Sequence, residues 1–203
     1  MWTEHVVPRL ADLSLRGEEI GALRAATCDG LSGAVLEIGF GGGLNLRSYP
    51  PEVTSVSAVE PSDVGWRLSE PRRAAVGMPV ERTGLDGQRL TEADATFDSA
   101  LSTFTLCTIP DADAALREVR RVLRPGGRLH VLEHGLAPDP GVQRWQRRLE
   151  PFQRRLMGGC HLSRNVPALL AGAGFMVEDL EGAYLPGVSR ALGYVYRGRG
   201  LAA

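Results

Sequence analysis

Val35 to Gly43 reads VLEIGFGGG, an apolar run that ends in an acid and then a cluster of glycines. The apolar run predicts a buried strand, and the glycines predict a tight turn at its carboxyl end. In a doubly wound α/β fold, ligands bind at this edge of the sheet. The stretch therefore predicts the start of such a sheet. By itself, it leaves open whether the turn binds a ligand.

Two phosphate-binding patterns do not fit these glycines. A dinucleotide fingerprint read from Gly39 needs its third glycine at position 44, where the chain has Leu44. A P-loop needs a lysine, and the sequence contains none, so all 23 basic residues are arginines. What remains is an acid followed by glycines at alternate positions. Its carboxylate would repel a pyrophosphate but could accept a hydrogen bond from a positively charged amino group. These residues are Glu37, Gly39, Gly41 and Gly43.

Two further acids follow strand-like runs. Glu60 ends the run VTSVSAVE, about twenty residues beyond the glycines, where an acid binds the ribose hydroxyls in doubly wound folds. Asp86 follows the next run and, with the backbone N–H of Gly87, could bind an adenine amino group. Each is also compatible with an ordinary loop acid or an Asp-Gly turn. Together with the glycines, they favour a nucleoside-containing ligand.

Seven apolar runs alternate with helix-like stretches, which predicts a mostly parallel sheet with helices on both faces. The runs are GAVLEIG, VTSVSAVE, PVERTG, FDSALST, GRLHVLEH, FMVEDLEG and ALGYVYRG. The connection between the last two is too short for a crossover helix, so we expect this pair to be antiparallel. Between the fourth and fifth runs, the pattern predicts a helix that Asp111 caps and Pro125 ends.

The composition limits the class of protein and its partners. A length of 203 residues with 43% hydrophobic content suits one domain with a full core. The formal charge of −1 creates no field that would recruit nucleic acid. Residues 1–20 carry charges throughout, so we expect no signal peptide or membrane anchor and a cytoplasmic protein. Cys28, Cys107 and Cys160 lack CxxC spacing, which predicts reduced thiols and no metal site.

Four segments, in this order and spacing, resemble motifs of the class I S-adenosylmethionine-dependent methyltransferases. They are VLEIGFGGGLN, VEPSD, FDSALST and REVRRVLRPGGRLHVLEHG, and the resemblance covers residues 30–197. It implies a Rossmann-like α/β fold with a seven-stranded sheet whose last strand is antiparallel. It also implies S-adenosylmethionine as cofactor and S-adenosylhomocysteine as product. The implied cofactor-binding residues are Glu37, Gly39, Phe40, Gly41, Gly43, Asn45, Glu60, Pro61, Asp86, Gly87, Ser102 and Thr103.

By this resemblance, the glycines would pass close to the methionine part of the cofactor and Glu37 would bind its amino group. Phe40 stands where many members have a smaller residue, and it narrows the implied pocket. The other implied contacts are Glu60 with the ribose, Asp86 and Gly87 with the adenine, and Ser102 and Thr103 beside the sulfonium.

The C-terminal half has a second, narrower similarity. STFTLCTIPD, EHG, WQRRLEPFQRRLMGGCHLSR and GYVYRG resemble a methyltransferase-like subfamily whose animal members methylate small alkyl thiols. The implied reaction is an in-line displacement at a methyl carbon, for which positioning supplies much of the acceleration. The implied acceptor is a small, fairly apolar molecule, and a thiol is favoured.

Two histidines are candidate catalytic residues. His134 follows the fifth run at the carboxyl edge and His161 lies in GGCHLSR, so each is a candidate base toward the acceptor. Each is also compatible with a structural role. His130 is expected in the core. Cys160 could be a nucleophile or a metal ligand, but a small apolar filler explains it as well. Because a thiol with an ordinary pKa of about 8.5 is partly ionised at neutral pH, a base is not strictly required.

Residues 142–157 predict a basic amphipathic helix that Pro151 would kink. Its apolar stripe would be Val142, Trp145, Leu149, Phe152 and Leu156, with arginines opposite. The helix could pack on the sheet, cover the acceptor pocket or make peripheral contact with an anionic membrane. We expect one methyltransferase domain over residues 1–203, with a helical cap (1–30), a cofactor-binding half (31–135) and a lid and substrate-side half (136–203).

Other functions remain open at this point. N- or C-methylation of a lipid headgroup or a quinone would also suit a basic helix beside an apolar pocket. A non-catalytic S-adenosylmethionine-binding protein would carry the same cofactor residues. The missing third glycine disfavours a nicotinamide-dependent oxidoreductase. Nucleic-acid and protein acceptors are disfavoured because no broad basic surface or recognition domain is evident.

Overall fold

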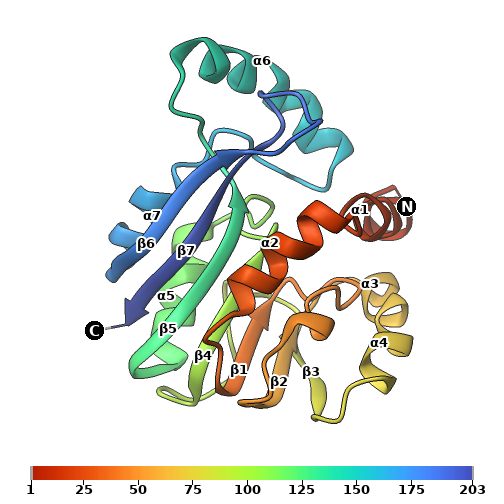
Figure 1. The fold of residues 1–203 in the computed structure, drawn as a ribbon, viewed down its shortest axis with the longest axis vertical. Helices are drawn as coiled ribbons and strands as arrows, with labels where there is room; N and C mark the ends of the chain where they lie inside the picture. The colour runs from red at the N-terminus through yellow and green to blue at the C-terminus, as the bar shows by residue number, and fades with distance from the viewer. Residues whose placement is uncertain (1, 203) are drawn as a thin grey trace.

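A computed structural model describes residues 2–202, and its centre is a seven-stranded sheet (Figure 1). The strands are β1 (Gly33–Ile38), β2 (Val53–Val59), β3 (Val80–Gly84), β4 (Phe97–Thr103), β5 (Leu123–His134), β6 (Phe175–Tyr184) and β7 (Tyr194–Ala202). Their order across the sheet is β3-β2-β1-β4-β5-β7-β6. Strands β1 to β5 pair in parallel, whereas β7 pairs antiparallel with both β5 and β6. The expected α/β architecture with its antiparallel last strand is confirmed.

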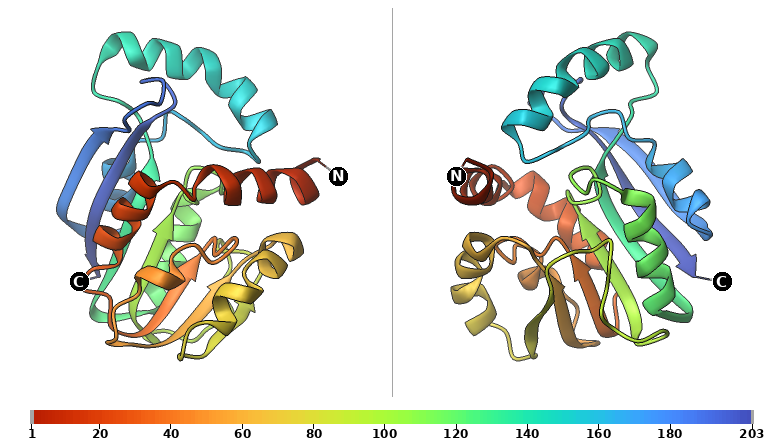
Figure 2. Two further views of the ribbon diagram at one scale, coloured as in Figure 1. Left: turned by 45° about the vertical axis from the view of Figure 1, so that its right-hand side comes forward. Right: turned by 180° about the vertical axis from the view of Figure 1, so that it is seen from behind.

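Helices cover both faces of this sheet. They are α1 (Val7–Ser14), α2 (Glu18–Cys28), α3 (Asp63–Leu68), α4 (Glu70–Ala74), α5 (Ala112–Val122), α6 (Pro140–Leu156) and α7 (Val166–Gly172), with short helical turns η1 (Trp2–Val6) and η2 (Leu46–Ser48). Helix α2 lies on one face, and α5 and α7 lie on the other (Figures 1 and 2). Helices α1 and α6 lie instead above the carboxyl ends of the parallel strands.

Strand β1 shows how alternation divides the core between the two faces. Leu36 and Ile38 belong to the apolar cluster that includes Leu116 of α5. Val35 belongs to the opposite cluster, which includes Cys28 of α2. Successive side chains of a strand point to opposite faces, so a central strand covered on both sides is apolar throughout. Glu37 is the exception, on the same parity as Val35.

Helix α5 follows its predicted pattern at the start and differs at the end. The Asp111 carboxylate accepts from the N–H of Ala114 at 2.8 Å, as expected of an N-cap. The helix ends at Val122, so the predicted end at Pro125 is wrong. The chain enters β5 directly, because Leu123 already pairs with Phe97 of β4.

Helix α6 buries only part of the apolar face that its spacing predicts. Trp145, Phe152 and Leu156 are exposed by 58%, 68% and 53%. Its buried residue is Gln146, whose side-chain amide accepts from Ala137 N–H at 3.0 Å and donates to the Gly135 carbonyl at 2.9 Å. The predicted apolar stripe is confirmed only in part. Leu149 packs against the cluster of Cys107, Cys160 and Leu162, and Val142 is half-buried, while the other three residues of the stripe face outward.

The N-terminal segment meets the end of α6 above the sheet. The indole Nε1 of Trp2 donates to the carbonyl of Leu156 at 2.9 Å, joining η1 to the end of α6. Over the residues described, no helix combines the length and the apolar content needed to cross a membrane.

Candidate active site

A cavity of about 560 Å³ lies where the parallel strands end. Its wall includes the glycine turn after β1, Glu60 after β2, and the loops that follow β3 and β4. Residues of η1, α1 and the end of α6 cover it. The volume is in the range of small-molecule sites, so the sheet edge expected to bind a ligand is hollow.

The cavity brings together most of the predicted site residues. Those that line it are Gly39, Phe40, Gly41, Glu60, Pro61, Asp86, Gly87, Thr103 and His134. Glu37, Gly43, Asn45, Ser102 and His161 are absent from its wall. Residues of the wall that the sequence did not single out include Arg24, Thr105 and Ile109.

Glycine is needed at the positions of this turn for different structural reasons. Gly39 and Gly41 both adopt a positive φ, +70° and +56°. A Cβ on Gly39 would lie 2.0 Å from Oγ1 of Thr105, so the turn after β4 requires a glycine there. A Cβ on Gly41 would meet no neighbouring atom closer than 4.0 Å. Gly41 therefore leaves open space beside the cavity that a ligand can occupy.

Gly42 allows helix α1 to dock on the glycine turn. A Cβ there would lie 2.1 Å from Oδ1 of Asp12, a buried residue of α1. The Asp12 carboxylate pairs with Arg72 at 2.9 Å and also with Arg16. The sequence did not reveal this contact, because an acid on a short N-terminal helix usually faces solvent.

A buried polar network connects α2 to the glycine turn. One guanidinium nitrogen, Nη1 of Arg24, donates to Asn45 Oδ1 and to Thr103 Oγ1, both at 2.7 Å. Burial lowers the pKa of Arg24, and its Nε has no partner among the described residues. Arg24 also lies over the ring of Phe104, 5.4 Å from its centroid. The cavity wall therefore includes a buried guanidinium that is only partly satisfied by the described residues.

Glu37 lies behind this network. Its carboxylate accepts from Asn45 Nδ2 at 2.8 Å and from the hydroxyl of Tyr49. Burial raises its pKa to about 7. Its strand parity turns it toward the α2 face, where Asn45 lies between Glu37 and Thr103. Glu37 thus supports the wall residue Thr103 through Asn45, and its direct contact with a ligand stays a prediction.

Glu60 connects two of the binding loops. Its Oε2 accepts from Gly41 N–H at 2.6 Å, and its Oε1 accepts from Ser62 N–H at 2.7 Å. Burial raises the pKa of Glu60, and these two hydrogen bonds partly oppose the rise. Asp86 is exposed, and the side chain and backbone N–H of Gln88 lower its pKa. Both acids face the cavity from neighbouring loops, as the sequence predicted.

Glu133 organises the turn after β4. Its fully buried carboxylate accepts from the hydroxyl of Ser102 at 2.6 Å. It also accepts backbone N–H groups of Thr105, Leu106 and Cys107 at 2.9 to 3.4 Å. This engagement explains why Ser102 lies outside the cavity. The signal for Glu133 was an acid at the end of an otherwise apolar run, HVLEH.

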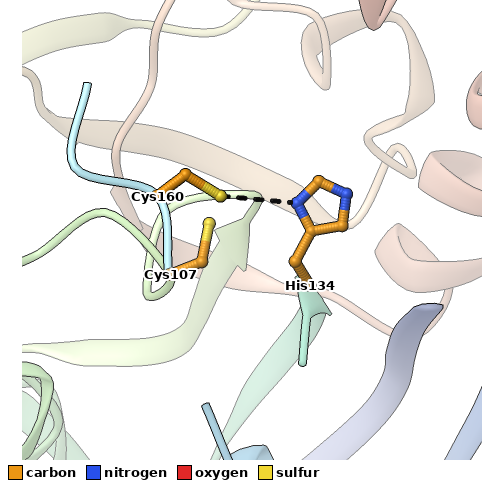
Figure 3. Close-up of side chains that lie close together, drawn as sticks. All are labelled: Cys107, His134 and Cys160. Carbon is orange, nitrogen blue, oxygen red and sulfur yellow. Dashed lines mark hydrogen bonds between the residues drawn. The ribbon is translucent and has the colours of Figure 1, made fainter. Parts of the chain in front are cut away.

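Cys107, His134 and Cys160 cluster at one end of the cavity (Figure 3). Cys160 Sγ lies 3.9 Å from Nδ1 of His134. Hydrogen bonds from Cys107 and His134 lower the pKa of Cys160, and the pKa of Cys107 rises correspondingly. The ring of His134 also contacts Phe104 edge-on, with centroids 5.1 Å apart. Sequence reasoning treated these residues separately, because they lie far apart in the chain.

The other two histidines of this half lie outside the cavity. Nδ1 of His161 is 3.2 Å from Oε1 of Glu150, and His161 lines a separate shallow pocket with Asp111. His130 is in the core as expected, with Nδ1 2.7 Å from the Thr27 carbonyl, and burial lowers its pKa. The geometry therefore favours His134 over His161 as the histidine that faces a ligand.

Known proteins resemble this chain in sequence and in fold. A model of the methyltransferase domain matches residues 36–131. The thiol S-methyltransferase TMT1B of Rattus norvegicus is 34% identical over 154 residues, which cover 72% of this chain and 62% of that protein. A phosphatidylethanolamine N-methyltransferase of Cereibacter sphaeroides is 31% identical over 119 residues, 58% of each chain. This chain thus spans less than two thirds of the length of these curated relatives.

Solved structures show the same fold. A methyltransferase structure from Thermotoga maritima, described as S-adenosylmethionine-dependent and as a possible histamine N-methyltransferase, matches with a TM-score of 0.67. The match covers 99% of this chain and 100% of that chain at 22% identity. At that identity, the similarity extends to the fold alone.

Proposed function

Because the chain belongs to the class I S-adenosylmethionine-dependent methyltransferases, we propose that it methylates a small, fairly apolar acceptor, with a thiol as the accepting group. One observation carries the proposal. A single cavity is lined both by polar elements of the glycine turn and β2 loop, such as Gly41 and Glu60, and by Phe104, Cys107 and Cys160. Such a cavity can hold a polar cofactor and an apolar acceptor side by side.

The polar elements of the cavity wall fit S-adenosylmethionine. The open space at Gly41 admits a ligand close to the backbone, and the buried guanidinium of Arg24 has a free Nε. Arg24 would hold the carboxylate of the cofactor, Glu60 its ribose and Asp86 its adenine. When bound, the cofactor supplies an electrophilic methyl group on a sulfonium.

The protein's own contribution is positioning and the exclusion of water. Helix α1 and the end of α6 cover the cavity, so the acceptor is held in a partly closed site. A thiolate and a sulfonium both lose their charge in this reaction, which a dry site favours. Holding the acceptor sulfur in line with the methyl group accounts for much of the acceleration.

The thiol is favoured over other acceptors for two reasons. The similarity to the thiol S-methyltransferase covers more of this chain than the similarity to the lipid enzyme does, 72% against 58%. Among residues 2–202, the acids of the cavity wall are Asp12, Glu60 and Asp86, on the α1, β2 and β3 side, and Glu133 behind the turn after β4 is fully buried and satisfied by its neighbours. We therefore find no acid placed to bind a cationic headgroup beside Phe104. The predicted roles of His134 and of the cofactor contacts are part of this proposal.

The test is production of S-adenosylhomocysteine by the purified chain. S-Adenosylmethionine would be supplied with alkyl thiols, hydrogen sulfide, a quinol or phosphatidylethanolamine vesicles. We expect turnover with alkyl thiols, lost in Glu60→Gln and retained in the exposed control Glu52→Gln. Turnover on the quinol or the lipid alone would contradict the thiol assignment. Cofactor binding without turnover on any of them would favour a non-catalytic binder.

A further inference from the structure

We propose that Cys107, His134 and Cys160 form a site for a thiophilic divalent metal ion such as Zn²⁺, with one ligand position open to the cavity. The three protein ligands are argued from geometry alone. The identity of the fourth ligand, the acceptor thiol, rests on the proposed function. The spacing of the cysteines in the sequence predicted no metal site, because the three ligands come from different elements.

The donor atoms are already close to metal-binding distances. One donor atom from each residue lies within 4.8 Å of the other two, and the Sγ of Cys160 is 3.9 Å from Nδ1 of His134. Tetrahedral zinc with bonds of about 2.0 to 2.3 Å places its ligand atoms roughly 3.5 to 3.8 Å apart. A contraction of less than about 1 Å, within reach of side-chain rotation, would complete the triangle.

Backbone contacts hold the three elements together without a metal. The turn of Cys107 is fixed by Glu133, the residue before His134 in β5. The loop of Cys160 is tied to that turn, because His161 N–H donates to the Cys107 carbonyl at 2.8 Å. Two glycines with positive φ, Gly158 and Gly159, bring the chain from α6 into this loop. Pre-positioned ligands lower the entropic cost of binding a metal.

The ligand set and its location match an open zinc site. Two cysteines and one histidine with a fourth position free for substrate is a known arrangement of catalytic zinc. All three residues line the cavity, and the cysteines are only 2% and 4% exposed. Two thiolates would cancel the charge of the metal, so the loaded site would not repel a sulfonium.

The metal would activate the acceptor without changing its own oxidation state. A thiol that binds at the fourth position releases its proton to solvent and forms a metal–sulfur bond. A lone pair of this sulfur then forms the bond to the methyl carbon. The electrons of the old carbon–sulfur bond remain with the departing sulfur, which becomes neutral. The methylated product is a neutral thioether, a weaker ligand than the thiolate it replaces.

The first experiment measures metal binding by the full chain, without cofactor or acceptor. Reduced, metal-free protein would be titrated with Zn²⁺ against a chromogenic chelator, and with Co²⁺ to detect thiolate-to-metal charge transfer. We expect one ion per chain, with affinity reduced at least about tenfold in Cys107→Ala, Cys160→Ala and His134→Gln. The matched controls Cys28→Ala and His161→Gln should bind as the unmodified protein does, because both residues lie outside the cluster.

The result that overturns the site is equally direct. The proposed metal site would be contradicted if the unmodified protein bound Zn²⁺ no more tightly than the Cys107→Ala/Cys160→Ala double variant. It would also be contradicted if Cys28→Ala lost Zn²⁺ binding as much as the variants of the three proposed ligands, at an unchanged melting temperature.

A second experiment separates this inference from the proposed function. An alkyl thiol added to the Co²⁺-loaded protein without cofactor should change the visible absorption spectrum, as it enters the fourth position. Thiol methylation that persists unchanged after metal removal and in Cys160→Ala would overturn the metal's role and leave the proposed function standing. Stoichiometric metal binding in a protein that binds cofactor but methylates no thiol would contradict the proposed function and leave the metal site standing.

Discussion

At the scale of single residues, buried ionisable groups surround the cavity. Arg24, Glu37, Glu60 and Glu133 are each at most 6% exposed. Burial of charge is costly unless the group is paired or hydrogen-bonded. Glu60 and Glu133 accept several backbone N–H groups, which offsets this cost, whereas Arg24 has a nitrogen without a partner among residues 2–202. These four residues form a buried polar framework in the cavity wall (Arg24, Glu60) and behind it (Glu37, Glu133).

Glu37 gives a prediction about pH. Its folded-state pKa of about 7 is above its ordinary value, so the folded state favours the protonated form. Glu37 therefore adds to the free energy of unfolding in full at pH values below about 4.5. This contribution, on the order of 3 kcal/mol, is lost as pH rises through about 7. Glu37→Gln should remove most of this dependence. The measurement is urea unfolding of the cofactor-free protein between pH 5 and pH 8.

Glu60 and Glu133 have raised pKa values as well, so the variant should retain part of the slope. An equal slope in the unmodified protein and in Glu37→Gln would contradict the assignment of this effect to Glu37.

Gly39 and Gly41 give a second prediction because they tolerate a methyl group differently. Gly39→Ala places a Cβ against Thr105 and should destabilise the fold by several kcal/mol, on the order of a severe core clash. Gly41→Ala should cost only about 1 kcal/mol of backbone strain but weaken S-adenosylhomocysteine binding, because its methyl group would occupy the open space beside the cavity. Thermal unfolding and calorimetric titration measure the two effects.

If Gly41→Ala binds as tightly as the unmodified protein, the ligand does not approach this part of the turn. Equal loss of stability in both variants would show that the two glycines have the same structural role.

At the scale of elements, sequence pattern predicted the strands better than the covering helices. Strand burial follows from apolar runs that any parallel sheet must contain, and all seven runs form strands. For α6, the helix was predicted correctly, but only Val142 and Leu149 of its apolar stripe are partly covered. Spacing shows where an apolar stripe lies, but it does not show how much of it another surface covers. The polar contacts of Gln146 orient the helix, and a lone glutamine carries no signal of this in the sequence.

The outer face of α6 gives a prediction about surfaces. Trp145, Phe152 and Leu156 are exposed there. The same helix carries exposed arginines at positions 144, 147, 148, 154 and 155. A basic helix with exposed aromatic residues is suited to anionic lipid, with roughly 1 kcal/mol per arginine near the surface. We expect the protein to sediment with vesicles rich in phosphatidylglycerol but not with phosphatidylcholine vesicles.

The double variant Trp145→Ser/Phe152→Ser should lose this binding at an unchanged melting temperature, because both side chains are exposed. Unaltered sedimentation of the double variant would exclude α6 as the contact.

At the scale of the whole molecule, topology explains what the sequence could predict. Parallel strands β1 to β5 end at one edge, so residues at or just after their carboxyl ends had to meet there, and Glu60, Asp86, Thr103 and His134 do. Contacts that depend on side-chain packing between distant elements were not predictable in the same way. The Arg24 network and the cysteine–histidine cluster belong to this class, since each joins residues separated by tens of positions.

Ligand linkage gives a prediction for the entire chain. S-Adenosylhomocysteine at about 100 times its Kd should stabilise the fold by about 2.7 kcal/mol. For a chain of this size, that corresponds to a rise in Tm of roughly 5 to 11 °C. NADH should produce no rise, and Glu60→Gln should abolish the rise with S-adenosylhomocysteine. A shift with NADH alone would instead support a nicotinamide-dependent enzyme.

The contact between Trp2 and Leu156 has a consequence for the timing of a reaction cycle. The roof of the cavity is made by two segments from distant parts of the chain, and η1 contributes no buried residue to it. The exposed hydrogen bond between Trp2 and Leu156 is worth about 1 kcal/mol. Helix α1 is held more firmly, because its buried Asp12 also pairs with Arg72 beside the glycine turn. Residues 2–6 therefore separate from α6 at a smaller cost than α1 leaves the glycine turn, and a ligand that passes through this part of the roof would exchange at the rate at which residues 2–6 move.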